Sequence, residues 1–253
     1  MMACVSSTIC YLYQMRGKFM KGIILAAGDG GRLHELTRET PKVLLEVGGW
    51  PLIHYPITAM QLGGVTEITV VVGHNAEKVE KFLGNLYPEI LFQYNENHAG
   101  GNALSIGVVR DFVDGDSFVV CMGDHPISNR IVGNLLSNPW NGDILCIDPK
   151  AIEPEQLNDA TRVFVDGDGY IVRIGKGLKT WNAIDIGVFK MTSDVFSVID
   201  LLITRQGMEV GISDLVRYMG ANGRPFATCD IEGEFWSDVD TLEDYMATKN
   251  RMN

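Results

Sequence analysis

A glycine-rich segment in the first part of the sequence is the clearest sign of chemistry. It reads LAAGDGGRL and spans Leu25–Leu33. Glycine lets backbone N–H groups approach phosphates closely, because no Cβ intervenes. The dinucleotide fingerprint requires glycine where Leu33 stands, and Gly17-Lys18-Phe19 and Gly175-Lys176-Gly177 both fail the Walker A pattern. The segment therefore indicates a phosphate loop of another kind or a structural turn without a ligand.

Two cations favour the phosphate-loop interpretation. Arg32 follows the glycines directly, and Pro41-Lys42 comes ten residues after Arg32. Cations beside backbone donors make a site for a polyphosphate. The chain as a whole is acidic, with 21 Lys and Arg, 32 Asp and Glu, and a net charge of −11. This balance argues against a nucleic-acid coat or a membrane-surface binder, since both need a basic footprint.

Two aspartate segments lie far apart in the sequence. Asp124 follows a β-rich run and Gly123, and Asp238 lies in the segment Gly233–Thr241 before the last predicted helix. Carboxylates of this kind hold Mg²⁺ in phosphoryl and nucleotidyl transfer. Asp124 could instead cap a helix, and Asp238 or Asp240 could belong to the turn that leads into Thr241. Their presence together with the phosphate loop favours the functional interpretation.

The elements that would position these residues alternate in type. Short β-rich runs separated by helical periodicity predict βαβ crossovers and a mainly parallel sheet. The predicted strands are Gly22–Ala27, Glu67–Val72, Ile90–Tyr94, Ser117–Met122 and Asp143–Ile147, and the predicted helices are Pro51–Leu62, Ala76–Leu86, Asn102–Phe112 and Ile127–Leu136.

The second part of the chain has a different rhythm. A Gly/Asp turn at 166–169 predicts a β-hairpin. A strand at Ile184–Met191 and a final helix with Thr241 as N-cap are also expected. We predict one continuous domain from residue 20 to 253, with a nucleotide-binding half (20–148) and an acceptor-binding half (149–253). Residues 1–19 are interpreted as an extension without function. The remaining predicted elements are the hairpin strands Arg162–Val165 and Tyr170–Ile174, the helices Ser193–Thr204, Ile212–Met219 and Thr241–Met252, and the strand Phe226–Asp230.

Composition limits the cellular setting. Five scattered cysteines without a C-x-x-C pair exclude a regular disulfide framework and a zinc ribbon, and they fit a reducing compartment. No apolar run approaches the roughly 18–20 residues of a membrane span. We therefore expect a cytoplasmic protein. The sequence leaves open whether it is a homo-oligomer.

The opening motif resembles that of the nucleotidyltransferases that activate sugar phosphates and alcohol phosphates. Their signature runs L-A-A-G-x-G-T-R-L, a short gap, then P-K-P. Gly31 stands here where threonine is usual, and Val43 where the second proline is usual. The resemblance implies a Rossmann-like α/β fold of the GT-A-like nucleotidyltransferase type, with a mixed, mainly parallel sheet flanked by helices.

Later motifs narrow the resemblance to the archaeal-type CTP:inositol-1-phosphate cytidylyltransferases. Gly123-Asp124-His125 resembles the corresponding segment of that subgroup, and Ile231–Asp244 resembles its D-G-E-L-W-x-D-V-D-T-x-E-D. Similar matches occur at Val163–Leu178, Ile184–Phe189 and Gly101–Ser105. The resemblance extends from Met20 to the C-terminus, and its motifs agree in order and spacing.

The resemblance implies a role for each matched residue. Asp124 and Asp238 would be the Mg²⁺ ligands, while the role of Asp240 and of His125 is open. Arg32 and Lys42 would be the catalytic cations. Lys176 would hold the acceptor phosphate, and Asp185 would bind acceptor hydroxyls or serve only a strand turn. The residues implied to bind the nucleotide are Ala26, Ala27, Gly28, Asp29, Gly30, Gly31, Gly101, Asn102 and Ser105.

The implied reaction is Mg²⁺-dependent transfer of a cytidylyl group from CTP to an alcohol or sugar phosphate, with inositol-1-phosphate as the leading acceptor. The products would be CDP-inositol, a precursor of phospholipids or compatible solutes, and pyrophosphate. Members of the subgroup are often fused to a membrane-spanning synthase that uses this product, so any such partner would here be a separate chain. Two alternatives stay open: a hexose-1-phosphate nucleotidyltransferase using UTP, dTTP or GTP, and a non-catalytic relative that senses nucleotides.

Overall fold

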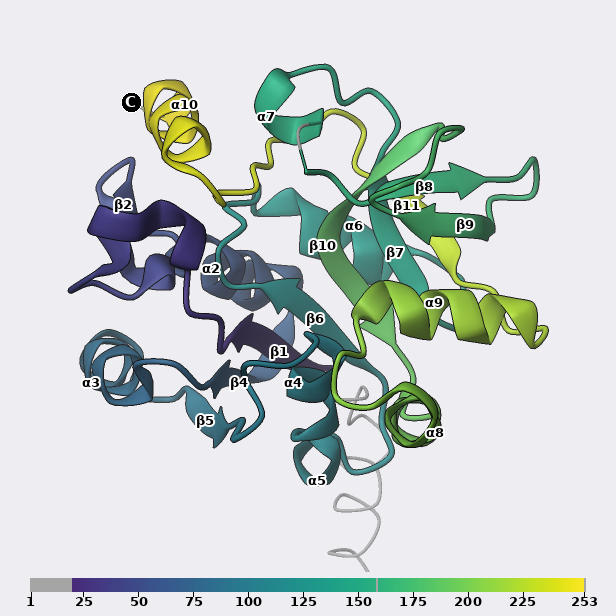
Figure 1. The fold of residues 1–253 in the computed structure, drawn as a ribbon, viewed down its shortest axis with the longest axis horizontal. Helices are drawn as coiled ribbons and strands as arrows, with labels where there is room; N and C mark the ends of the chain where they lie inside the picture. The colour runs from purple at the N-terminus through teal and green to yellow at the C-terminus, as the bar shows by residue number, and fades with distance from the viewer. Residues whose placement is uncertain (1–19, 158, 253) are drawn as a thin grey trace, which may run out of the picture.

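The computed structural model describes residues 20–157 and 159–252, and it omits the side chains of residues 34, 35, 154 and 155. The predicted extension, 1–19, lies outside the described residues. The centre of the molecule is a mixed sheet in the strand order β11-β7-β10-β6-β1-β4-β5, with the hairpin β8–β9 attached through β10 (Figure 1). The strands are β1 (Met20–Ala26), β4 (Val65–Val72), β5 (Leu91–Tyr94), β6 (Phe118–Met122), β7 (Ile144–Asp148), β8 (Arg162–Val165), β9 (Ile171–Gly175), β10 (Ala183–Met191) and β11 (Ala227–Asp230).

Along this order, β10 is the exception to parallel pairing. It runs antiparallel to both β6 and β7, whereas β1 pairs in parallel with β4 and β6, and β11 pairs in parallel with β7. The predicted mixed, mainly parallel sheet is therefore confirmed. Because β10 is reversed, the beginning of β10 lies at the same edge of the sheet as the carboxyl ends of β1 and β6.

Helices cover both faces of the sheet. Side chains alternate between two faces along each strand, so neighbouring residues Ile23 and Ile24 of β1 enter different cores. One face is covered by α4 (Ala103–Gly107), α5 (Arg110–Val113), α8 (Val195–Gln206) and α9 (Ile212–Ala221), and the other by α2 (His54–Gly63), α3 (Ala76–Leu86) and α6 (Arg130–Ser137).

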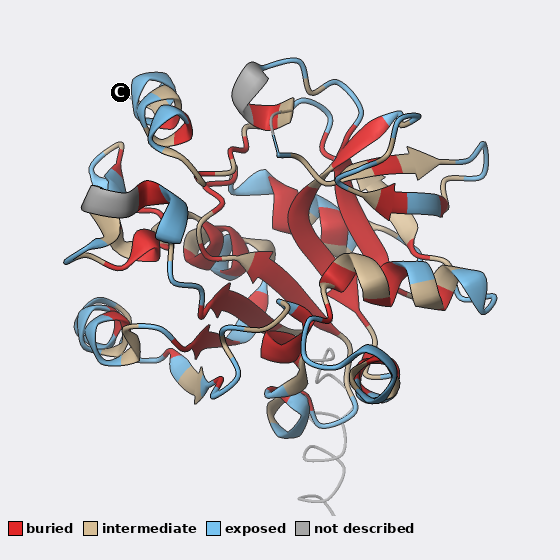
Figure 2. Ribbon diagram, in the orientation of Figure 1, coloured by how far each residue is buried: buried red, intermediate tan, exposed pale blue. Residues whose placement is uncertain are grey.

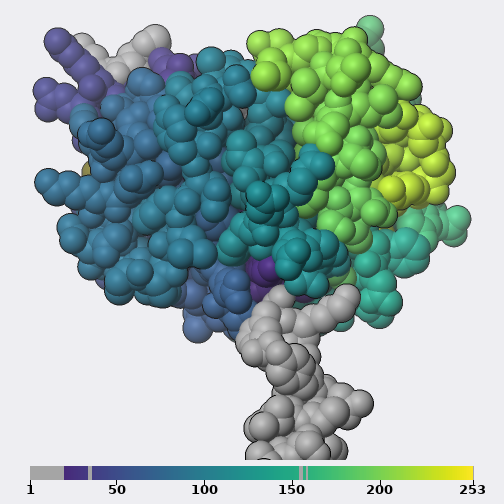
Figure 3. Space-filling model, turned by 90° about the horizontal axis from the view of Figure 1, so that it is seen from below, coloured from purple at the N-terminus to yellow at the C-terminus, as the bar shows by residue number. Residues whose placement is uncertain are grey.

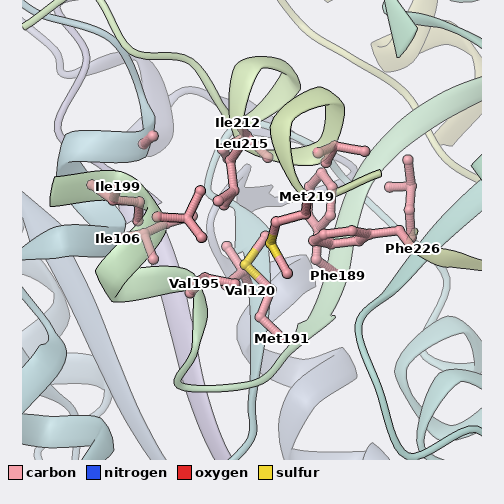
Figure 4. Packing of buried hydrophobic residues seen from close by; sticks show 14 of the residues in the cluster. Ile106, Val120, Phe189, Met191, Val195, Ile199, Ile212, Leu215, Met219 and Phe226 are labelled. Carbon is pink, nitrogen blue, oxygen red and sulfur yellow. The ribbon is translucent and has the colours of Figure 1, made fainter. Parts of the chain in front are cut away.

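The central strands are buried, while the outer sides of the helices are exposed (Figure 2). In the first core, Val195 and Ile199 of α8 and Leu215 and Met219 of α9 pack over Phe189 of β10 (Figure 4). The strands from both parts of the chain share one sheet, and a view from below shows the two parts joined without a gap (Figure 3). The single-domain prediction is thus confirmed.

The structure differs from the predicted elements in several places. The single helix expected over Asn102–Phe112 is wrong, because the chain forms the two short helices α4 and α5 instead. The sequence pattern also gave no sign of a small sheet formed by β2 (Glu46–Val47) and β3 (Trp50–Pro51), or of the short helix α7 (Pro154–Leu157). The 3₁₀ helices η1 (Gly31–Thr37) and η2 (Lys42–Leu44) were likewise not predicted.

The final helix, α10 (Leu242–Met252), begins as the sequence predicts. The Thr241 hydroxyl accepts a hydrogen bond from the backbone N–H of Asp244 at 3.2 Å, and the Asp244 carboxylate accepts one from the backbone N–H of Thr241 at 2.7 Å. These reciprocal bonds satisfy two backbone donors at the start of the helix. They also fix the point at which the Asp238 segment enters α10.

Candidate active site

Two adjoining cavities lie at the carboxyl ends of β1 and β6. The backbone N–H of Gly123 donates to the carbonyl of Leu25 at 2.9 Å, which holds the two strand ends together. The cavities have volumes of about 360 and 310 Å³. We call the larger one the phosphate-loop cavity and the smaller one the Lys176 cavity. Both are lined by Arg32, Asn102, Met122, Asp124 and Asp240, so they meet at these side chains.

The phosphate-loop cavity gathers the residues to which the resemblance assigns nucleotide binding. Its lining includes all nine of them: Ala26, Ala27, Gly28, Asp29, Gly30, Gly31, Gly101, Asn102 and Ser105. Arg32 and Lys42 line it as well, which places two cations beside the loop backbone. The sequence alone could not show that residues 26–31 and 101–105 share one cavity.

The loop backbone requires glycine at position 30 but not at position 31. Gly30 has a φ of 67°, and a Cβ there would lie 2.8 Å from Cβ of Lys42, so only glycine allows this close approach. Gly31 donates its N–H to the Asp29 carboxylate at 3.0 Å, which turns Asp29 toward the loop backbone. A Cβ at Gly31 would come no closer than 3.5 Å to another atom, so the usual threonine of the family signature would fit here.

Gly101 and Asn102 also have structural roles. A Cβ on Gly101 would lie 2.1 Å from the carbonyl oxygen of Val210, and the Gly101 N–H already donates to the carbonyl of Met208 at 2.8 Å. The Asn102 side-chain oxygen accepts the N–H of Ile212 at 2.8 Å and so holds the start of α9. Both residues therefore shape the cavity wall, whatever they contribute to a ligand.

Three carboxylates meet where the cavities join. Oxygens of Asp124, Asp238 and Asp240 lie within 4.8 Å of one another. Asp124 Oδ1 and Asp238 Oδ1 are buried and have no hydrogen-bond partner among the described residues. A buried, unpaired carboxylate oxygen is costly. Divalent cations such as Mg²⁺ take oxygen ligands of this kind, so the residues present fit a divalent metal.

Lys42 lies next to this cluster. Its Nζ is 2.6 Å from Asp124 Oδ2 and 2.5 Å from Asp240 Oδ1, and the residue is only 8% exposed. Burial acts to lower the pKa of Lys42, but the negative charges of Asp124, Asp240 and Asp238 outweigh burial and raise it. Lys42 therefore stays charged inside the site. The sequence predicted neither the burial nor the contact with Asp240.

A second set of ion pairs joins residues that line the Lys176 cavity. Asp159 pairs with Arg32 and also lies 2.6 Å from Lys176 Nζ, while Arg32 pairs with Asp240. Arg32 and Lys176 are thus brought together by one carboxylate. Sequence analysis missed Asp159, because it belongs to an irregular segment after α7 and to none of the motifs. Only the three-dimensional arrangement identifies it.

Asp185 lies near the beginning of β10 and lines the Lys176 cavity. Burial raises its pKa to about 6, although its carboxylate accepts the Gly187 N–H at 2.8 Å and His125 acts in the opposite direction. The reversal of β10 explains how a residue so far along the chain reaches the end of β6.

His125, whose role was open, lies between Asp238 and β10. Its Nδ1 is 2.9 Å from the carbonyl oxygen of Ile186, which can only accept, so Nδ1 carries the proton. Its Nε2 is 3.2 Å from Asp238 Oδ1, without the alignment of a hydrogen bond. Burial acts to lower the pKa of His125, but Asp238, Asp124 and the Ile186 carbonyl raise it to about 10. A charged His125 neutralises Asp238 and orients it.

The Asp238 segment is held by Trp236. Trp236 is 2% exposed, and its Nε1 donates to the Asp148 carboxylate at 2.8 Å. The backbone N–H of Ser237 donates to the carbonyl of Pro126, and Ser237 Oγ lies 2.6 Å from Thr248 Oγ1. These contacts tie the segment to the loop after Asp124 on one side and to α10 on the other.

The comparisons with known proteins agree with this architecture. Residues 21–138 match the family model described as Nucleotidyl transferase. This match agrees with the family that the sequence motifs predicted.

Particular relatives carry more specific names. The chain is 29% identical over 235 residues, 92% of its length, to the "Bifunctional IPC transferase and DIPP synthase" of Archaeoglobus fulgidus and covers 44% of that protein. The solved inositol-1-phosphate CTP transferase from T. maritima shares 25% identity, with a TM-score of 0.80 over 92% of this chain and 96% of that one. A putative glucose-1-phosphate thymidylyltransferase from Bacillus anthracis shares 27% identity, with the same TM-score over 92% and 95% of the two chains. The chain spans about half the length of the curated relatives it matches.

Proposed function

We propose that this protein transfers a cytidylyl group from CTP to inositol-1-phosphate in a Mg²⁺-dependent reaction that releases pyrophosphate. The observation that carries the proposal is the meeting of the two cavities at Arg32, Asp124 and Asp240. One cavity suits a nucleoside triphosphate, and the other, with Lys176 and Asp185, suits a phosphorylated polyol. The names of the relatives, an IPC transferase and an inositol-1-phosphate CTP transferase, support this choice of substrates.

The chain supplies charge and position rather than a nucleophilic side chain. A phosphate monoester is already ionised near neutral pH, so the acceptor oxygen can attack the α-phosphorus directly. Lys42 and Arg32 would neutralise the charge that builds up on the phosphates, and they would exchange their present carboxylate partners for phosphate oxygens. Lys176 would bind the acceptor phosphate and Asp185 its hydroxyls. Pyrophosphate is the leaving group.

Asp124 and Asp238 are proposed to hold the Mg²⁺. Bound there, the metal would polarise the phosphates and template their geometry. Asp124 and Asp238 each offer a buried oxygen without a hydrogen-bond partner among the described residues, although that of Asp238 lies 3.2 Å from His125 Nε2. Both oxygens of Asp240 are instead paired with Lys42 and Arg32. Asp240 is therefore assigned mainly to positioning the two cations.

A hexose-1-phosphate nucleotidyltransferase remains the second candidate, because one structural neighbour is a putative glucose-1-phosphate thymidylyltransferase. The test is pyrophosphate release with Mg²⁺, crossing CTP, UTP, dTTP and GTP with inositol-1-phosphate, glucose-1-phosphate, mannose-1-phosphate and phosphocholine. A signal that requires CTP and inositol-1-phosphate supports the proposal. Activity with a hexose phosphate instead would overturn the choice of inositol-1-phosphate as acceptor. If the protein binds CTP but releases pyrophosphate with none of the acceptors, it would be a nucleotide sensor.

The helices of the described residues offer no segment long and apolar enough to cross a membrane. We propose that the product passes to a synthase, in line with the two-part names of the curated relatives, and that this synthase spans a membrane, as the sequence resemblance implies. A cytoplasmic location belongs to the same proposal.

A further inference from the structure

A buried pair of polar side chains lies behind the wall of the phosphate-loop cavity. Asn95 follows β5 directly and is 1% exposed, and its backbone N–H continues the sheet by donating to the carbonyl of Val72 at 2.8 Å. Its side-chain Nδ2 donates to Ser105 Oγ at 3.0 Å. Ser105 is 5% exposed and lines the cavity. Asn95 does not line it, so Asn95 reaches a ligand only through neighbours such as Ser105.

The orientation of the Asn95 amide is fixed by a backbone group. The N–H of Asn97 donates to Asn95 Oδ1 at 2.9 Å. A backbone N–H can only donate, so the atom facing it must be the oxygen. If the Asn95 amide were flipped, its NH₂ group would face the Asn97 N–H, and neither of these two donors could accept a hydrogen bond. The NH₂ group of Asn95 therefore faces Ser105.

This orientation determines what the Ser105 hydroxyl can do. Because an NH₂ group cannot accept, Ser105 Oγ must be the acceptor of that hydrogen bond. The hydroxyl proton then has to be donated to another group, and no described residue accepts it. Since Ser105 faces the cavity, a bound ligand is the group left to receive it.

The lining around Ser105 suggests which part of a nucleotide it meets. Four of the charged residues that line the cavity, Arg32, Lys42, Asp124 and Asp240, are joined by ion pairs and suit the phosphates. Ser105 belongs instead to the uncharged stretch that includes Gly100 and Gly101. An uncharged wall with one buried hydroxyl suits a nucleobase.

We propose that Asn95 is a positioning residue that commits the Ser105 hydroxyl to donating, and that this donor selects cytosine over uracil. The inference rests on the proposed function and deepens it. N3 of cytosine carries a lone pair and accepts, whereas N3 of uracil carries a hydrogen and donates. A hydroxyl committed to donating pairs with cytosine N3, but with uracil it leaves both groups unpaired, and such a mismatch gives strong discrimination.

The test uses Asn95→Asp, Ser105→Ala and the double variant, with binding of CTP and UTP measured calorimetrically in the presence of Mg²⁺. A carboxylate at position 95 accepts both the Asn97 N–H and the Ser105 proton, so the Ser105 lone pairs then face the cavity. We expect wild type to bind CTP about tenfold more tightly than UTP. Ser105→Ala should bring this ratio close to one, and Asn95→Asp should reverse it.

The double variant separates positioning from a general structural effect. Its CTP:UTP ratio should equal that of Ser105→Ala alone, since Asn95 acts through the hydroxyl. An unchanged ratio in the folded single variants, or a wild type that prefers UTP, would overturn the inference. If Asn95→Asp does not fold, the CTP:UTP ratio of Ser105→Ala is the test of the inference. Absence of pyrophosphate release from wild type would overturn the proposed transfer reaction instead, and the binding ratios would still report on the base.

Discussion

At the scale of single residues, charge at the junction of the two cavities is the main determinant of the proposed chemistry. Lys42 is held between Asp124 and Asp240, and its raised pKa keeps it protonated across the neutral range. His125 is charged for a similar reason. The sequence pointed to Lys42, Asp124 and Asp238 separately. It could not show that Asp240 joins Lys42 to Arg32, because the residues lie about 200 positions apart and only packing brings them together.

Replacement of Lys42 should remove one electrostatic contact to the transferring phosphate. We expect Lys42→Ala to lower turnover by about 10²–10³-fold. Lys81→Ala, which removes a lysine exposed on α3, is the control and should leave the rate unchanged. Steady-state pyrophosphate release measures both. Near-normal turnover of Lys42→Ala would remove Lys42 from the mechanism.

Replacement of Asp124 or Asp238 tests the proposed metal site. We expect Asp124→Asn and Asp238→Asn each to lower turnover by at least about 10²-fold and to abolish the rise in melting temperature that Mg²⁺ gives to wild type. Asp194→Asn is the matched control, since Asp194 pairs with Arg224 away from both cavities. A full Mg²⁺-induced rise in both site variants would place the metal elsewhere.

Asp185 predicts a pH dependence of stability. Its pKa in the folded protein, about 6, lies above the ordinary value of 3.8, so the folded state binds this proton more tightly than the unfolded state. The resulting stabilisation is complete below about pH 4 and is lost as pH rises through 6. Asp185→Asn keeps an oxygen for the Gly187 N–H and should be more stable than wild type at pH 8, by up to about 3 kcal/mol. Urea unfolding at pH 4 and pH 8 measures this, and an equal difference at the two pH values would contradict it.

At the scale of elements, the sequence predicted most of the sheet and its covering helices. Continuous apolar runs such as Ile68–Val72 mark strands buried on both faces, and the structure confirms β4 there. The prediction of a single helix over residues 102–112 was wrong, because the chain forms the two helices α4 and α5 there. The segment 102–112 bends between α4 and α5, because its first turn is fixed by contacts to residues 208–212. Such long-range contacts leave no local pattern. The β2–β3 pair is also too short to show periodicity.

Two glycines of the phosphate-loop cavity should respond differently to alanine. A Cβ at Gly28 meets open space, so Gly28→Ala should keep the stability of wild type and raise the KM for nucleotide up to about tenfold. A Cβ at Gly101 would overlap the Val210 backbone, so Gly101→Ala should lose at least about 2 kcal/mol of unfolding free energy. Chemical denaturation and steady-state kinetics distinguish the two. Equal stability of both variants would show that Gly101 is not needed for packing.

At the scale of the whole molecule, the reversed strand β10 is what makes one site from two parts of the chain. It carries Asp185 to the end of the sheet where β6 delivers Asp124, and the segment before α10 returns to the same place with Asp238 and Asp240. The resemblance to the family led to these residues and to their class of reaction. It could not identify Asp159 or Asn95, because they belong to no motif and only the fold brings them to Arg32 and Lys176 or to Ser105.

The central claim is that the two cavities bring CTP and inositol-1-phosphate together for a direct transfer. The most direct measurement is identification of the products by mass spectrometry after wild type is incubated with both substrates and Mg²⁺. We expect CDP-inositol and pyrophosphate in equal amounts, with neither formed when Mg²⁺ is chelated and both formed at least about 10²-fold more slowly when Asp238→Asn replaces wild type. Pyrophosphate without CDP-inositol, or no product while CTP still binds, would contradict it.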